Sequence, residues 1–240
     1  MTQRVTRNLG AVLGLLLGLL NVRAQEAFLD QILVPTDFDV TASVTPNVSQ
    51  IFTDFPTFNS LVLDDFEVTG MDLTIRSVQA LFVAQSGFES FDSVSGYRLS
   101  LFDDPMLAAS SLVGNIASVS IPSSSGDFSL EQVGVSDLGL VTLTGEWTVP
   151  AVGTYWVGVA PEAPFSVAGQ FSVANGGASG VDGGSNGFFA NPSNGFGNGT
   201  FQSLPTDFAF LVSSEVIPEP SAGLLVLIGA LVGVVRRRGM

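Results

Sequence analysis

The chain has 240 residues, of which 46% are hydrophobic and 12% charged, which is enough apolar material for one sizeable domain together with targeting segments. Residues 26–219 hold all 22 acidic residues but only two arginines, a net charge of −20, which excludes nucleic acid and anionic membrane surfaces as partners because phosphate contacts require clustered cations. Cysteine, histidine and lysine are absent, which excludes disulfides, thiolate or imidazole metal sites, and the catalytic groups that depend on these residues.

The first 24 residues have the parts of a secretory signal. Arg4 and Arg7 precede an apolar run over residues 9–20, and Val22 and Ala24 occupy the positions that signal peptidase reads. We predict an N-terminal signal helix that is removed after Ala24. The alternative is a permanent N-terminal anchor, which is disfavoured because an apolar run of about 12 residues is too short to span a bilayer comfortably.

Most of the remaining chain has the pattern of β-strands. Residues 25–58 are predicted to be an N-terminal extension or the first strands, and residues 59–214 to form the exported domain. In that domain apolar and polar residues alternate with period two between turns rich in Gly, Ser, Asn and Pro. The spacing of these segments predicts an all-β domain, and specifically an antiparallel, jelly-roll-like β-sandwich.

Two segments show the alternation most clearly. In the first, the residues predicted to face the core are Val141, Leu143, Trp147 and Val149. In the second, the residues predicted to share one face of a strand are Phe165, Val167, Phe171 and Val173. Further strands are predicted at residues 61–68, 73–84, 97–102, 116–121, 154–160 and 207–212. Residues 175–199 are rich in Gly, Asn and Ser and are predicted to form a long surface loop.

Residues 215–240 follow the last predicted strand. They contain, in sequence, a proline-containing spacer, an apolar run and a basic cluster, which is the arrangement of a membrane tail. The positions that define it are the spacer Pro218, Glu219 and Pro220, the small residue Ser221, and the terminal cluster Arg236, Arg237 and Arg238. The two prolines make the spacer stiff and non-helical. The apolar run over residues 222–235 predicts a single C-terminal transmembrane helix, and the arginine cluster is predicted to stay in the cytosol and stop transfer, with the domain outside.

The length of this apolar run leaves an alternative open. A helix over residues 222–235 would be about 21 Å long, whereas the hydrocarbon core of a bilayer is about 30 Å thick. The alternative is therefore a buried C-terminal helix of the domain. The arginine cluster, the absence of a polar face and the export signal at the other end of the chain favour the membrane.

Taken in order, these elements resemble the PEP-CTERM protein-sorting domain, whose members are processed by exosortase in bacteria that make extracellular polysaccharide. The resemblance covers residues 217–239. It implies recognition at the Pro-Glu-Pro spacer, removal of the tail, and delivery to the cell surface or extracellular matrix. The exported domain is also loosely similar to β-sandwich domains often found ahead of this tail, which assigns no activity to it.

No cofactor is predicted, and calcium is the metal whose oxygen ligands the composition retains. The candidate ligands are Asp64, Asp65, Asp92, Asp103, Asp104 and Asp182, and the alternative for them is solvated carboxylates in turns. Residues 37–42 begin like an EF-hand loop but lack its glycine, and residues 176–182 are one residue out of step with a calcium β-roll repeat. No metal ligand is therefore assigned.

Aromatic residues suggest sugar binding more readily than catalysis. The candidates for an aromatic platform are Tyr97, Trp147, Tyr155 and Trp156. Trp147 shares a face with Val141 and Leu143 and is predicted to be in the core, so Trp156 is the better candidate for exposure. Glycoside hydrolysis would need two carboxylates at a fixed separation, and no pair stands out in a polar and aromatic setting. No catalytic residue is assigned.

The sequence therefore predicts an exported, non-enzymatic cell-surface or matrix protein with a structural or adhesive role. Signal peptidase and exosortase are its predicted processing enzymes, and the C-terminal helix is its predicted contact with the membrane before processing. The alternative is a carbohydrate-binding module that acts on extracellular polysaccharide, and a hydrolase is a third and more distant reading.

Overall fold

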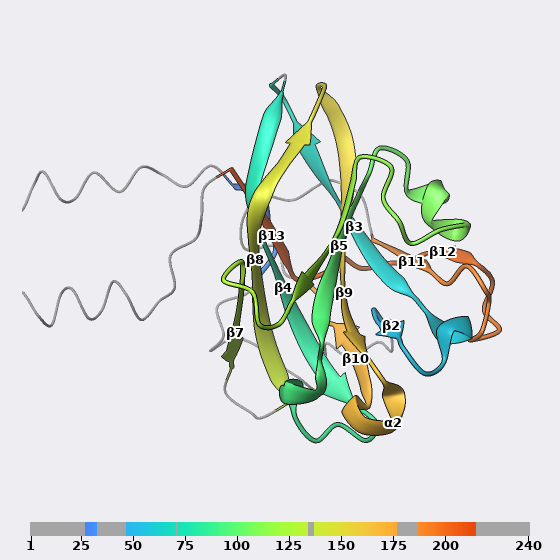
Figure 1. Cartoon of the computed structure of the whole chain (residues 1–240). Coiled ribbons are helices and arrows are strands. Elements are labelled where there is room, and N and C mark those ends of the chain that lie inside the picture. Colours follow the sequence, from blue (N-terminus) through green and yellow to red (C-terminus); the bar gives the residue numbers. More distant parts are fainter. Residues whose placement is uncertain (1–26, 33–46, 71, 134–136, 177–186, 215–240) are drawn as a thin grey trace, which may run out of the picture.

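The computed structural model describes residues 27–32, 47–70, 72–133, 137–176 and 187–214, which form two β-sheets packed face to face (Figure 1). The described residues contain thirteen strands and four short helical segments. The prediction of an all-β domain with two antiparallel sheets is confirmed. No helix in this part of the chain is long and apolar enough to cross a membrane. The predicted signal helix and the C-terminal membrane tail lie outside the described residues.

The first sheet has six antiparallel strands in the order β1-β13-β4-β8-β7, and β10 also pairs with β4. Its strands are β1 (Ala27–Asp30), β4 (Leu73–Gln85), β7 (Phe128–Gln132), β8 (Leu138–Val149), β10 (Gln170–Val173) and β13 (Phe210–Ser213). The long β4–β8 pair lies at its centre, and its register shifts between Ile75 and Ser77. These long strands match the predicted segments because a long strand with one core face keeps its alternation.

The second sheet has seven strands in the order β12-β11-β3-β9-β5-β6, and the short β2 pairs with β9 in parallel. Its strands are β2 (Ile51–Phe52), β3 (Leu61–Val68), β5 (Gly96–Phe102), β6 (Ala117–Pro122), β9 (Gly153–Ala163), β11 (Phe188–Ala190) and β12 (Phe201–Ser203). β1 and β2 show that residues 27–30 and 51–52 belong to the two sheets, so first strands precede residue 59.

The main core fills the space between the two sheets. From β8 it receives Val141, Leu143, Trp147 and Val149, all buried as the alternation predicts. The second sheet contributes the even positions of β3, including Phe66, which is fully buried. Because alternate side chains of both sheets meet in this layer, the domain can be stable without disulfides.

A second apolar layer covers the outer face of the second sheet. The odd positions Leu61 and Leu63 of β3 pack there with Phe102, and Ala108 of the short helix η4 (Pro105–Ala109) lies in the same cluster. β11 and β12 also contact η4. This second layer explains why residues 61–66 of β3 are all buried, whereas a strand with one solvent-facing side would alternate.

The strand predicted from Phe165 to Val173 is wrong in its first half. Residues 165–168 form the short helix α2 (Phe165–Ala168), and only residues 170–173 form a strand, β10. Gly169 separates the two with φ +71°, a conformation that favours glycine. As a result Phe165 and Val167 are exposed, whereas Phe171 and Val173 lie in the core.

The predicted surface loop over residues 175–199 is also wrong in part. Residues 177–186 lie outside the described part, but residues 188–190 form β11, which pairs with both β3 and β12. Phe189 and Ala190 are buried. Polar composition predicts turns for this segment, but the sequence does not show that the edge of β3 is available to pair with a three-residue strand.

The packing of the core predicts that substitution by alanine destabilises the domain much more at Phe66 than at Phe55, although the sequence alone does not distinguish these two phenylalanines. Phe66→Ala leaves a cavity between the sheets and should lower the free energy of unfolding by about 3–5 kcal/mol. Phe55→Ala, at a side chain 49% exposed, should cost less than about 1 kcal/mol. Urea unfolding followed by tryptophan fluorescence measures both, and equal losses in the two variants would contradict this packing.

Candidate functional site

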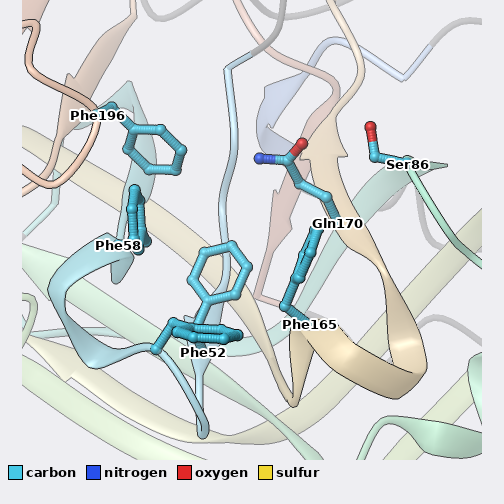
Figure 2. Close-up of a pocket in the computed structure, with 7 residues that line it drawn as sticks. Phe52, Phe58, Ser86, Phe165, Gln170 and Phe196 are labelled. Carbon is cyan, nitrogen blue, oxygen red and sulfur yellow. The ribbon is translucent and has the colours of Figure 1, made fainter.

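Five phenylalanines line a groove at one end of the domain. They are Phe52, Phe55, Phe58, Phe165 and Phe196. Ser86 and Gln170 complete the lining, and the groove encloses about 360 Å³ (Figure 2). We call it the phenylalanine groove. Its volume lies at the lower end of the range of about 300–1,000 Å³ that is typical of ligand pockets.

The five rings come from three segments that are far apart in the sequence. Phe52 ends β2, and Phe55 and Phe58 follow in the turn that contains the short helix η2 (Pro56–Phe58). Phe165 begins α2, and Phe196 lies in the loop between β11 and β12. Figure 1 shows β2 and α2 at the lower right of the domain, where the end of β9 leads into α2.

The rings form two groups of contacts. Phe165 lies 6.3 Å from Phe52 and 6.3 Å from Phe55, measured between ring centroids, and meets Phe55 edge to face. Phe58 and Phe196 are 5.2 Å apart, also edge to face. Figure 2 shows Phe58 and Phe165 on opposite sides of the groove. The groove is thus a slot with an aromatic wall on each side.

A buried amide side chain joins two of these segments. Gln50 is fully buried, and its Nε2 donates to the carbonyl oxygens of Gly169 at 3.1 Å and Ala163 at 3.4 Å. Its Oε1 accepts a hydrogen bond from the backbone N–H of Phe171 at 2.9 Å. Gln50 therefore ties the start of β2 to the chain on both sides of α2.

A second buried amide holds the third segment in place. Asn191 Nδ2 donates to the carbonyl oxygens of Asn59 at 2.8 Å and Thr57 at 3.3 Å, and its Oδ1 accepts from the N–H of Phe196 at 3.3 Å. A Cβ on Gly195 would come within 2.4 Å of the carbonyl oxygen of Thr57, so the close approach of the two loops requires glycine.

Asp54 fixes the position of Phe165 from outside the groove. Its two carboxylate oxygens accept hydrogen bonds from the backbone N–H groups of Phe165 at 2.8 Å and Ser166 at 3.0 Å. Desolvation raises the pKa of Asp54, but these hydrogen bonds outweigh it, so its pKa lies below the usual aspartate value. Asp54 therefore stays ionised and keeps its bonds to the start of α2 at neutral pH.

The lining of the phenylalanine groove is mostly aromatic. None of its lining residues is charged, and its polar side chains are the amide of Gln170 and the hydroxyl of Ser86. Phe55, Phe58 and Phe165 are 49%, 37% and 41% exposed. A cluster of exposed aromatic rings with polar groups at its edge is typical of an interaction site.

Removing Asn191 should loosen the groove. Asn191→Ala leaves the half-buried carbonyl oxygen of Asn59 without this donor, so we expect the free energy of unfolding to fall by about 1–3 kcal/mol. The N–H of Phe196 should also exchange with solvent faster, because its acceptor is lost. Hydrogen exchange followed by NMR measures this, with the exposed-site variant Asn198→Ala as the control. Unchanged exchange at Phe196 would contradict the role given to Asn191.

The four aromatic residues considered as candidates for a sugar platform do not form one. Tyr97, Trp147 and Tyr155 are buried in the main core, and burial raises the pKa of the Tyr97 hydroxyl. Trp156 was the predicted exposed ring, but it is half-buried and packs into the outer apolar layer. Its indole N–H is buried and has no partner among the described residues. Trp156 is therefore the least buried of the four rings, as predicted, but it is not free in solvent because it packs against the second apolar layer.

The candidate calcium ligands are dispersed. Asp64 and Asp65 are buried in the middle of β3, Asp104 caps η4, and Asp103 forms a hydrogen bond with Asn115. Asp92 lies in the short helix η3 (Phe91–Ser93), and Asp182 lies outside the described residues. Among the described residues no group of three or more acidic side chains is placed to hold a metal ion.

Asp64 lies in the inter-sheet core and is fully buried. Its Oδ2 accepts a hydrogen bond from the N–H of Phe208 at 2.6 Å, and its Oδ1 accepts from the N–H of Asp65 at 2.9 Å. With its amide turned to donate, Gln31 lies 2.8 Å from the same Oδ2. Burial raises the pKa of Asp64 to about 8, and the negative charge of Asp207 acts in the same direction.

This buried carboxyl makes stability depend on pH. An unfolded aspartate ionises near pH 4, whereas Asp64 in the folded state keeps its proton up to about pH 8, so the folded state binds more protons in this window. The free energy of unfolding should therefore fall as pH rises from 4 to 8, by at most about 1.4 kcal/mol per pH unit from this group.

Asp64→Asn should remove that slope, because its side chain does not ionise. Urea unfolding at several pH values measures the slope in the two proteins, and Asp103→Asn provides a control at an exposed carboxylate. The same slope in the wild-type chain and in Asp64→Asn would rule out this role for Asp64.

The phenylalanine groove was not predicted from the sequence. A signal was present, since Phe52, Phe55 and Phe58 follow one another at intervals of three residues in a segment without strand alternation. The contributions of Phe165 and Phe196 had no such signal, because one was assigned to a strand and the other to a loop. The predicted sorting and cleavage residues, including Ala24 and the Pro-Glu-Pro spacer, lie outside the described residues.

No protein-family model matches the chain, and no curated protein matches it.

Proposed function

We propose that this chain is an exported cell-surface or extracellular-matrix protein with a structural or adhesive, non-enzymatic role, sorted through a PEP-CTERM tail. The observation that carries the proposal is the order of the tail, in which the Pro-Glu-Pro spacer at residues 218–220 is followed by an apolar run and three arginines. In this proposal the sandwich has a jelly-roll-like topology and is the part displayed outside the cell. Signal peptidase acts after Ala24, and exosortase acts at the tail.

The position of the spacer fits removal of the tail. β13 ends at Ser213, and the spacer begins at Pro218, so a cut near Ser221 removes no strand of either sheet. The sequence contains no cysteine, so no disulfide stabilises the sandwich, and the apolar core between the two sheets supplies its stability. A domain with these properties can remain folded after it is separated from its tail.

The charges of the tail favour transient insertion. Placing an arginine at the centre of a bilayer costs roughly 2.5–3.5 kcal/mol on insertion scales, so three at the end of the apolar run resist passage through the membrane. The short run, by contrast, holds a helix in the bilayer only marginally. The same tail can therefore stop export for long enough to be cut and still be removed from the mature protein.

The proposal predicts the C-terminus of the mature protein. Mass spectrometry of the protein from its native host should find the N-terminus at Gln25 and no peptide beyond about Ser221, because both targeting segments have been removed. Replacing Arg236, Arg237 and Arg238 with glutamine should reduce retention at the membrane and yield uncut or released protein.

The matched control keeps charge and length by replacing the same residues with lysine, which should preserve processing. Recovery of the intact tail, arginines included, from the mature surface protein would contradict the processing step and would leave a simple membrane anchor.

A second candidate function is supported by the phenylalanine groove. A carbohydrate-binding site combines aromatic rings that contact the sugar with a few placed polar groups, and the groove has exposed phenylalanines together with Gln170 and Ser86. This candidate is compatible with export, because the extracellular polysaccharide of the host would be the ligand. It is tested separately from sorting, by ligand binding and not by the fate of the tail.

A further inference from the structure

We infer that the phenylalanine groove binds a neutral pyranose unit whose hydroxyl groups are equatorial, as in a β-1,4-linked glucan, with the sugar ring inserted between Phe58 and Phe165. This inference rests on the carbohydrate-binding candidate and names the kind of sugar that it takes. It follows from three properties of the groove: the arrangement of its walls, its charge and its few polar groups.

The walls select a flat ligand with two apolar faces. Phe58 and Phe165 stand on opposite sides of the groove, and Figure 2 shows their rings edge-on. The π face of an aromatic ring attracts C–H groups, since the face is negative and the C–H groups are weakly positive. A pyranose with equatorial hydroxyls has C–H groups on both faces. An axial hydroxyl, as in mannose, would instead turn a polar group toward one aromatic wall.

The charge of the domain selects a neutral ligand. The groove has no charged lining residue, whereas the chain between residues 26 and 219 carries a net charge of −20. Arg76 and Arg98, the arginines of the described domain, are each paired with a glutamate. An anionic polymer such as a polyuronate would meet net repulsion and no available cation, and the same repulsion disfavours a second copy of this chain as the occupant.

The polar groups and the size of the groove fit the edge of a sugar. In Figure 2 the amide of Gln170 lies beside the space between Phe58 and Phe165, where it can reach hydroxyls at the rim of an inserted ring, whereas Ser86 lies on the far side of Phe165. The remaining hydroxyls would stay in solvent at the open side of the slot. A volume of about 360 Å³ suits one or two sugar units and is small for an amphipathic helix, which requires several turns of contact.

The inference is tested by calorimetric titration of the protein, purified as its host exports it, with three soluble probes. Cellopentaose should bind, mannopentaose should bind at least about tenfold more weakly, and tri-galacturonate should show no binding. Phe58→Ala and Phe165→Ala should each weaken cellopentaose binding at least about tenfold, because each removes one aromatic wall.

The matched control is Val167→Ala, an exposed apolar residue of the same short helix that does not line the groove, and it should leave cellopentaose affinity unchanged. Circular dichroism should show that all variants keep the wild-type β structure.

No binding of cellopentaose, equal affinity for the three probes, or binding unaffected by Phe58→Ala and Phe165→Ala would each overturn the inference. So would self-association that Phe165→Ala abolishes, because a second copy would then occupy the groove. The mass of the mature C-terminus reports on sorting independently of all these results.

Discussion

The phenylalanine groove depends on hydrogen bonds that two buried amide side chains make to the backbone of distant loops. Gln50 joins β2 to both ends of α2, and Asn191 joins the turn after β2 to the loop after β11. A buried amide bonded at both of its polar ends is stable, whereas one left unpaired costs about 1–3 kcal/mol, so each amide has essentially one arrangement of its partners. These bonds hold the segments that carry the exposed rings in place, and the contacts between the rings add to them.

The sandwich supplies a rigid base for this site. Its main core is closed between the sheets, and a second apolar layer under η4 and the β11–β12 pair covers the outer face of the second sheet. Together the two layers bury both faces of β3, which leaves its carboxylates Asp64 and Asp65 without access to solvent. Apolar side chains that remain exposed at the groove therefore differ from the rest of the domain, where large apolar groups are mostly covered.

The sequence predicts the long strands well and the groove poorly, for a physical reason. Alternation shows which residues share a face of a strand, so the core positions of β8, such as Val141 and Leu143, are found correctly. It does not show what covers a face, so it does not predict that Trp156 packs under a second apolar layer or that Asp64 is fully buried. Nor does it separate a strand from a short helix when the apolar residues are two apart, as at Phe165 and Val167. The bonds of Gln50, and those from Asn191 to Thr57 and Asn59, join residues 113–134 positions apart, which no local pattern records.

The central claim is that an exported sandwich presents a preformed aromatic slot for a neutral sugar. A crystal structure of the exported protein grown with cellopentaose tests it most directly. The account predicts electron density for a pyranose ring between Phe58 and Phe165, with its edge toward Gln170 and with Gln50 and Asn191 bonded as they are here. Sugar density at another surface, or a groove closed by rearrangement of α2 onto η2, would contradict it.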